Sequence, residues 1–383
     1  MLCAGVRADR IYGAAGRVYG WVVSLATCVF GGGMTSDSFA VSRARIVNVL
    51  VRRTLVSLAV VGIAAVPYAV FAALSGQWVA ASWTTMGALA ALIGLLLGGL
   101  RVGLLGAVLL AALTPLSIVL GGIPLAGAAL MALMCLGVGV SARVGLHRGT
   151  LMIPVLMASL LVAPPTWSGD PVSRTTASYL LWMTLFMGGG ALWANLVFPR
   201  LLRNRAPSRA EPAARSETVT YALIITVLCT LTTLGVLLWR PGSQGAWLVV
   251  TLLVVTEVGH HDTVSQAGRR VAGTVAGAAV ATVVASLTTS EAVLLTIGLI
   301  LAVIAGVIRQ GPHYGLYLAF MTPSIVVFSS ASIADVPSTD RHRVVFTLVG
   351  AALVLIASAL AVGWAHYQET HPVAHAVTPE GPS

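Results

Sequence analysis

A short charged stretch in the second half of the chain has residue types suited to proton transfer. Glu257 is followed at close spacing by His260, His261 and Asp262, within an otherwise apolar part of the sequence. If the predicted helix over 246–264 runs its full length, Glu257 lies inside the membrane, with both histidines one turn further on the same face. A carboxylate at that depth is a candidate for binding a coupling proton, with the imidazoles as relays.

A second interpretation of the same stretch is slightly favoured by the sequence. If the helix ends near Gly259, Glu257 lies at the membrane interface and pairs with Arg269 or Arg270. The two interpretations differ in the depth of one carboxylate, and they stay open at this point.

Two prolines at related positions suggest a path through the membrane. Pro154 follows Met152 by two residues, and Pro323 follows Met321 by two, with Thr322 between them. Proline removes a backbone donor and frees a carbonyl, which in lipid must be buried in protein or line a wet cavity. Paired interruptions of this kind predict a substrate path, although an ordinary proline kink explains them about equally well.

Arginines followed by small residues begin one predicted helix in each half. Arg101 and Arg270 each precede small residues, and Gly273 and Gly277 form a GxxxG spacing that allows two helix backbones to approach closely. We interpret the glycines as packing residues. The arginines either extend to the lipid headgroups or surround a cytoplasmic vestibule that concentrates anions, with the first role favoured.

The sequence carries no pattern typical of an enzyme, a metal site or a nucleic-acid-binding protein. No nucleophile and base occur at usable spacing, so we expect no catalytic residue and no cofactor. No zinc spacing or aromatic-interleaved basic stretch occurs, so nucleic acid is not an expected partner. The four cysteines form no CxxC pair, and the two within apolar runs are interpreted as small core residues: Cys135 and Cys229.

Composition identifies an integral membrane protein. The chain is 57% hydrophobic and 9% charged, where a soluble domain carries roughly 25% charged residues. Apolar runs approach the ~20 residues needed to cross the bilayer. The predicted fold is all-α and polytopic, with about twelve transmembrane helices at 55–74, 78–98, 101–120, 123–141, 150–165, 179–198, 219–239, 246–264, 271–288, 291–308, 313–330 and 344–365.

The chain also repeats itself at an offset of 169 residues. Without a gap, this offset aligns scarce residue types, such as Trp78 with Trp247 and Arg101 with Arg270. Internal duplication is a common way of building a transport path between two halves. The repeat fails from Glu257 to Asp262, since the residues 169 positions earlier are apolar.

The distribution of arginine predicts the orientation. Fifteen arginines fall on one side of the predicted spans and four on the other, so both termini are expected in the cytoplasm of a cell-membrane protein. Six helices in each half make the two repeats parallel. The expected segments are an N-terminal extension, the first half, a cytoplasmic Arg/Pro linker, the second half and a disordered tail: 1–42, 43–198, 199–218, 219–366 and 367–383. The extension reflects an over-extended gene start, with the true start at Met34, or else a signal peptide or an extra short span.

With these features placed, the chain resembles the fusaric acid resistance protein-like family, which is related to aromatic acid exporters. The resemblance rests on residues 270–277 (RVAGTVAG), residues 317–323 (YLAFMTP) and the tandem six-helix halves. It covers roughly residues 43–366 and is best in the second half. It implies a membrane transporter that exports aromatic or other organic acids, driven by the proton gradient.

The expected function is therefore that of a secondary transporter for a small organic anion. Its partners would be the lipid bilayer and the transported anion, and the sequence is also compatible with a homo-oligomer or an accessory cytoplasmic or envelope partner. The alternatives are an anion channel and a membrane scaffold that transports nothing.

Overall fold

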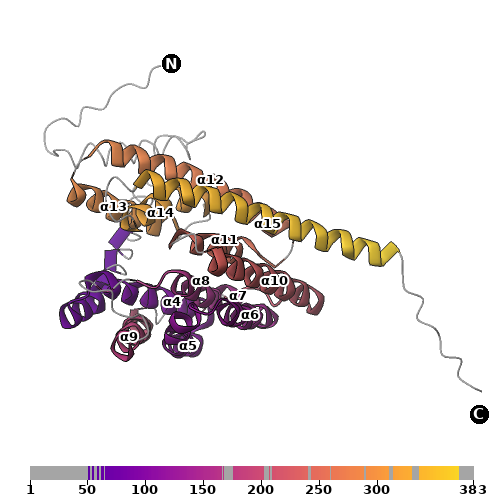
Figure 1. Cartoon of the computed structure of the whole chain (residues 1–383), viewed down its shortest axis with the longest axis horizontal. Helices are drawn as coiled ribbons and strands as arrows, with labels where there is room; N and C mark the ends of the chain where they lie inside the picture. The colour runs from indigo at the N-terminus through magenta and orange to yellow at the C-terminus, as the bar shows by residue number, and fades with distance from the viewer. Residues whose placement is uncertain are drawn as a thin grey trace, which may run out of the picture. The chain divides into compact units, whose positions relative to one another are not determined.

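The computed structural model of the chain is helical throughout its described part (Figure 1). It describes residues 51–370, apart from gaps at 52–53, 56–57, 60–61, 64, 166, 168–175, 202–206, 208, 240–242, 259, 289, 310–313 and 330–335. No strand occurs in these residues, so the predicted all-α class is confirmed. The predicted N-terminal extension, including Met34, lies outside the described residues.

The first half of the chain contributes both short and long helices. Its elements are helix Ala65–Ser75, α3 (Trp78–Ala81), α4 (Trp83–Gly98), α5 (Leu100–Leu120), α6 (Pro124–Ser141), η1 (Ala142–Val144), α7 (His147–Thr150), α8 (Met152–Val162) and α9 (Ala177–Leu201). Helix α4 packs against α5 and α9, and α5 packs against α8 and α9.

The second half follows after a connecting segment. Its elements are α10 (Arg215–Trp239), η2 (Ser243–Gly245), α11 (Ala246–Val255), α12 (His260–Ser286), α13 (Glu291–Arg309), α14 (Tyr314–Ser329) and α15 (Val336–Thr370). In Figure 1, α15 is the long yellow helix, and it packs against α11 and α12. A described helix thus overlaps each of the twelve predicted ranges.

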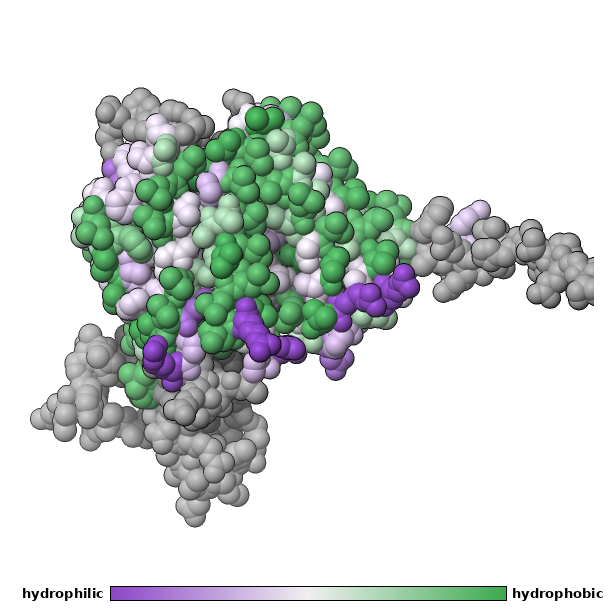
Figure 2. Space-filling model, turned by 90° about the horizontal axis from the view of Figure 1, so that it is seen from below, coloured by the Kyte–Doolittle hydropathy of each residue, from purple (hydrophilic) through white to green (hydrophobic). Residues whose placement is uncertain are grey.

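Within the described residues, five helices are long and apolar enough to cross a bilayer. They are Leu100–Leu120, Pro124–Val144, Ala177–Arg200, Arg215–Trp239 and Arg341–Gly363. Large apolar side chains on them point outward, among them Leu125 at 74% and Leu360 at 69% exposure. Exposed apolar surface on this scale is favourable in lipid and not in water, and Figure 2 shows it covering much of one face. The chain is a membrane protein, while the twelve-span arrangement as two repeats stays a prediction.

Two short helices pack against each other inside this bundle. Helices α8 and α11 have 11 and 10 residues, so α11 is about 15 Å long, about half of the ~30 Å hydrocarbon layer. Helix α11 is almost wholly buried, with Val249, Leu252 and Val255 at 0% exposure. A helix that ends part-way through a bilayer must bury its free backbone groups in protein.

The predicted linker is partly fixed to the first half. Helix α9 extends to Leu201 and α10 begins at Arg215, so the connecting segment is shorter than the predicted 199–218. The Ala210 amide donates to the Gly145 carbonyl at 3.2 Å, and the Ala213 amide donates to the Ala142 carbonyl at 3.1 Å. These bonds hold the segment against the end of α6 and η1.

Candidate functional site

Helix α11 stops abruptly, and threonines satisfy the backbone at the break. The Thr256 hydroxyl donates to the Leu252 carbonyl at 2.8 Å. The Thr263 hydroxyl accepts from the Glu257 amide at 3.2 Å and donates to the Glu257 carbonyl at 3.1 Å. Thr256 and Thr263 are 4% and 2% exposed, so these side chains replace the water that such groups would otherwise bind. We call residues Thr256–Thr263 the α11–α12 junction.

The junction corrects the predicted helix boundaries. Helix α11 ends at Val255, where the sequence predicted 264, and α12 begins at His260, where it predicted 271. Glu257 is therefore not helical, and the expected helical face shared with His260 and His261 does not exist. The side chains of these two histidines lie outside the described residues.

Glu257 forms an ion pair with Arg148 of the first half. Arg148 Nη2 and Nε lie 3.3 Å and 3.4 Å from Glu257 Oε2. The Arg148 side chain is 55% exposed and that of Glu257 is 18% exposed. The expected pairing with Arg269 or Arg270 is wrong for the described residues: α7 brings Arg148 to Glu257 instead. Sequence reasoning had used Arg148 only as an orientation signal, because no local pattern links residues 109 positions apart.

Two buried aromatic rings lie beside this ion pair. The rings of His147 and Tyr221 meet edge to face, with centroids 5.8 Å apart. His147 is 4% exposed, and its Nδ1 has no hydrogen-bond partner among the described residues. Burial, and then the positive charge of Arg148, lower the pKa of the His147 imidazole. Tyr221 lies close enough to Glu257 and Arg148 to interact electrostatically with both.

Helix dipoles favour the signs of charge found at the junction. The carbonyl end of α11 and the amide end of α12 meet there. An anion is stabilised beside a helix N-terminus and a cation beside a C-terminus. Glu257 lies between these two ends, so the α12 end favours its carboxylate, the α11 end opposes it, and the positive charge of Arg148 offsets the second effect.

Gly277, which the sequence predicted to be a packing residue, lies against the second proline site at Pro323. A Cβ added at Gly277 would lie 2.6 Å from Thr322 Cβ and 2.9 Å from Pro323 Cδ, so α12 and α14 approach closely there. Thr322 and Pro323 are buried, Met321 is half-buried, and Gly273 is buried on α12. The close approach requires glycine because a side chain at 277 would occupy the same space.

The two proline sites lie in different surroundings. Pro323 is inside α14, whereas Pro154 is in the first turn of α8, just after the interruption at Leu151. Helix α8 packs against α5 and α11, and α14 packs against α12 and α13. Their role in a substrate path stays a prediction.

The two arginines expected at an inner mouth are also carried by separate groups of helices. Arg101 is exposed on α5, and Arg270 is half-buried on α12. Helix α5 packs against α4, α8 and α9, whereas α12 packs mainly against α14 and α15. A shared vestibule likewise stays a prediction.

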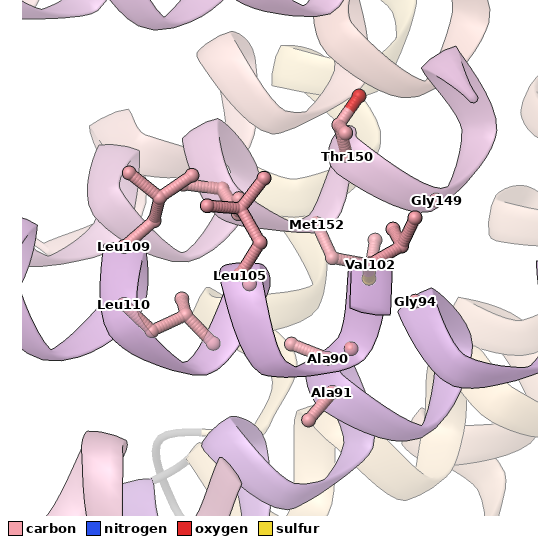
Figure 3. Close-up of a pocket in the computed structure, with 13 residues that line it drawn as sticks. Ala90, Ala91, Gly94, Val102, Leu105, Leu109, Leu110, Gly149, Thr150 and Met152 are labelled. Atoms are coloured by element: carbon pink, nitrogen blue, oxygen red, sulfur yellow. The ribbon is translucent and has the colours of Figure 1, made fainter. Parts of the chain in front are cut away.

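A small cavity lies in the first half between α4, α5, α7 and α8. Its volume is about 30 Å³, and its lining is almost wholly apolar (Figure 3), including Ala90, Gly94, Leu105 and Met152. Such a space suits a single small molecule at most. It shows how closely the small residues of α4 and α5 bring these helices together.

Residues 219–357 match the family model described as fusaric acid resistance protein-like. This part of the chain is similar to that family. The resemblance drawn from the sequence is confirmed there, and the family points to membrane transport or efflux. No curated protein and no solved structure matches the chain.

The fusaric acid resistance protein-like segment contains one side of the ion pair. It includes the α11–α12 junction, Gly277 and Pro323, whereas Arg148 lies before it. The candidate site is therefore completed by a residue outside the matched range.

A buried arginine at the other end of α11 was missed by the sequence reasoning. Arg343 is 4% exposed on α15, and its guanidinium carbon lies 3.9 Å from the centroid of the Trp247 ring. Cation–π contact of this kind stabilises a charge away from water. Helix α11 is thus flanked by arginine interactions at both ends.

The described residues contain no cluster of three or more side chains suited to hold a metal ion. The charged groups at the site can bind an anion or a proton, and these are the chemistries that the geometry supports.

Proposed function

We propose that the protein is a secondary transporter that exports small organic acids, aromatic ones among them, and that the α11–α12 junction is its coupling site. The family match supports transport in general. The observation that carries the proposal is the broken helix with Glu257 in the break, paired with Arg148 of the first half.

Broken helices in transporters place polar backbone and charged groups at the point where two halves meet. Here the break is buried, and the hydroxyls of Thr256 and Thr263 hydrogen-bond to its backbone. The Glu257 carboxylate in the break pairs with Arg148 on α7. An ionisable residue in such a position is a functional candidate because holding it there is costly.

The packing of the two halves supports a duplicated transporter. In the first half, α9 packs against α4 and α5, and α8 packs against α5. At an offset of 169 residues the counterparts are α15 against α11 and α12, and α14 against α12, and these pairs also pack. Similar packing on both sides is what an alternating movement of two halves requires.

The test is transport in everted membrane vesicles from cells that produce the protein. We expect radiolabelled benzoate to accumulate when a proton gradient is imposed, and to accumulate less in vesicles with Glu257→Gln. Gradients of both signs should be imposed, with vesicles lacking the protein as the control for leakage of the neutral acid.

The outcomes separate the candidate functions. Accumulation that ignores the proton gradient would contradict coupling. Steady currents carried by the anion in planar bilayers would favour a channel. Uptake no greater than that of the control vesicles would overturn transport of this class of anion.

A further inference from the structure

We propose that Arg148 is the anion-binding residue of the transporter, and that the transported anion replaces the Glu257 carboxylate on Arg148 while Glu257 takes up a proton. This inference rests on the proposed transport function. It goes further by naming the residue that recognises the anion and the stoichiometry of coupling, one proton with one monovalent anion.

The geometry of the ion pair suits exchange of partners. Both arginine nitrogens converge on one carboxylate oxygen at 3.3 and 3.4 Å, longer than the ~2.7–2.9 Å of a strong charge-assisted bond. The guanidinium is also half-exposed. An ion pair of this kind contributes little to stability, so an incoming anion can displace the carboxylate.

Arg148 is also equipped to bind an organic anion. Its planar guanidinium presents two parallel donors to a carboxylate or sulfonate, and arginine keeps its charge at all relevant pH values. Beside it lie the buried rings of His147 and Tyr221. His147 Nδ1 is buried without a hydrogen-bond partner among the described residues, so an unsatisfied polar atom lies on the residue next to the arginine.

Exchange of partners links proton and anion with a definite sign. When Glu257 is protonated, Arg148 loses its counter-charge and is free to take the anion. When the anion binds first, Glu257 loses the charge of Arg148, and its protonated form is favoured. By thermodynamic reciprocity each ligand strengthens the binding of the other by the same factor.

Other titratable and charged groups lie around Glu257. Helix α7 contributes His147 and Arg148, and α10 contributes Tyr221. The first residues of α12 are His260, His261 and Asp262, whose side chains lie outside the described residues. Burial keeps His147 neutral at neutral pH, so Arg148 is the charge that changes partner.

The proton and the anion therefore cross together, without net charge. Transport should respond to a pH difference and not to a membrane potential, and the anion should accumulate on the alkaline side. Export then follows whenever the outward concentration gradient of the acid exceeds the opposing pH gradient.

The experiment uses the full chain in proteoliposomes, with benzenesulfonate as the probe. Its sulfonate stays ionised over the whole working range, so any proton must be bound by the protein and leakage of a neutral acid is absent. We expect accumulation driven by a pH difference at zero potential, and none driven by a potassium–valinomycin potential at equal pH.

Three variants test the roles of the pair. Arg148→Gln should lower uptake about fivefold or more, whereas Arg143→Gln, an exposed arginine on the neighbouring turn, should leave it unchanged. Glu257→Gln resembles the protonated carboxyl, so its transport should become independent of pH and driven by the potential.

The failure of this inference is distinct from failure of the proposed function. If benzenesulfonate or benzoate is transported but Arg148→Gln behaves as Arg143→Gln, or the potential drives uptake by the unmodified protein, partner exchange is wrong and transport stands. If neither probe is transported by any variant, the proposed function fails.

Discussion

The α11–α12 junction differs sharply from the stretch 169 positions earlier in the chain. Thr256, Glu257 and Thr263, which build the break, correspond to Gly87, Ala88 and Gly94. In the first half these residues lie inside α4, which runs unbroken from Trp83 to Gly98. In the second half the helix stops, and a charged group stands in the gap.

The small residues of α4 are used for close packing. A Cβ added at Gly87 would lie 2.2 Å from the Met187 carbonyl oxygen, and one at Gly94 would lie 3.6 Å from Gly103 Cα. At Gly87 the backbone of α4 therefore approaches α9 too closely for a side chain, whereas at Gly94 it lies at an ordinary van der Waals distance from α5. Corresponding segments of the two halves therefore differ in role: α4 is a closely packed continuous helix, whereas its counterpart is interrupted by the polar α11–α12 junction.

The largest expected loss of stability comes from placing a carboxylate inside the closely packed helix α4. Ala88 is 1% exposed in α4, so Ala88→Glu buries a carboxylate with no partner and should cost roughly 3–5 kcal/mol. Glu257→Ala removes a partly exposed ion pair and should cost about 0–1 kcal/mol. Chemical unfolding in detergent measures both, and equal losses would show that the two regions do not differ as described.

A smaller loss of stability is expected when a side chain is added at the close contact between α4 and α9. Gly87→Ala forces apart the backbones of α4 and α9 and should cost roughly 1–3 kcal/mol. Gly137→Ala on α6 is the matched control, because a Cβ there meets nothing within 4 Å. The measurement is the thermal unfolding of the two variants in the same detergent. A stability loss in the control as large as that of Gly87→Ala would contradict the packing argument.

The junction should be weakened by removal of one hydroxyl. Thr263→Val loses both hydrogen bonds to the Glu257 backbone and should cost about 1 kcal/mol. Hydrogen exchange of the Glu257 amide should become faster, while Thr220→Val, at an exposed position of α10, should leave that amide unchanged. Unchanged exchange in Thr263→Val would mean that the threonine does not hold the break.

The last expected effect concerns the pH dependence of stability. The pKa of His147 is lowered from 6.5 in the folded protein, so the unfolded chain takes up a proton first as the pH falls through 6.5. Stability should therefore decrease below that pH, by at most about 1.4 kcal/mol per pH unit, and His147→Phe should reduce the slope. The counterpart of His147 at the offset of 169 residues is Leu316, which has no titratable group. An unchanged slope in His147→Phe would rule out this contribution.

Much of the fold could be predicted because membrane helices depend on local composition. Apolar runs and arginine-rich turns gave the positions of the helices, and residues 270–277 indicated the family that matches the second half. The end of α11 could not be predicted in the same way. Apolar residues continue to Val255, and the place where the helix stops depends on Thr263 binding the Glu257 backbone from the next helix.

The partner of Glu257 in the ion pair could not be predicted either, because it lies far away in the sequence. Glu257 was found from the sequence because a carboxylate is rare in an apolar stretch, and the failure of the repeat from 257 to 262 marked the region. Its partner was assigned to a neighbour in sequence, Arg269 or Arg270, because nothing in the order of residues indicates which distant helix lies beside it.

The sequence by itself determined that this is a helical membrane protein, that its second half is fusaric acid resistance protein-like, and that charge interrupts one place in that half. These properties follow from composition and short-range pattern, since transfer into lipid acts on each segment separately. Only the tertiary structure decided that α11 stops at Val255 and that Glu257 meets Arg148, because both depend on packing between segments far apart in the chain.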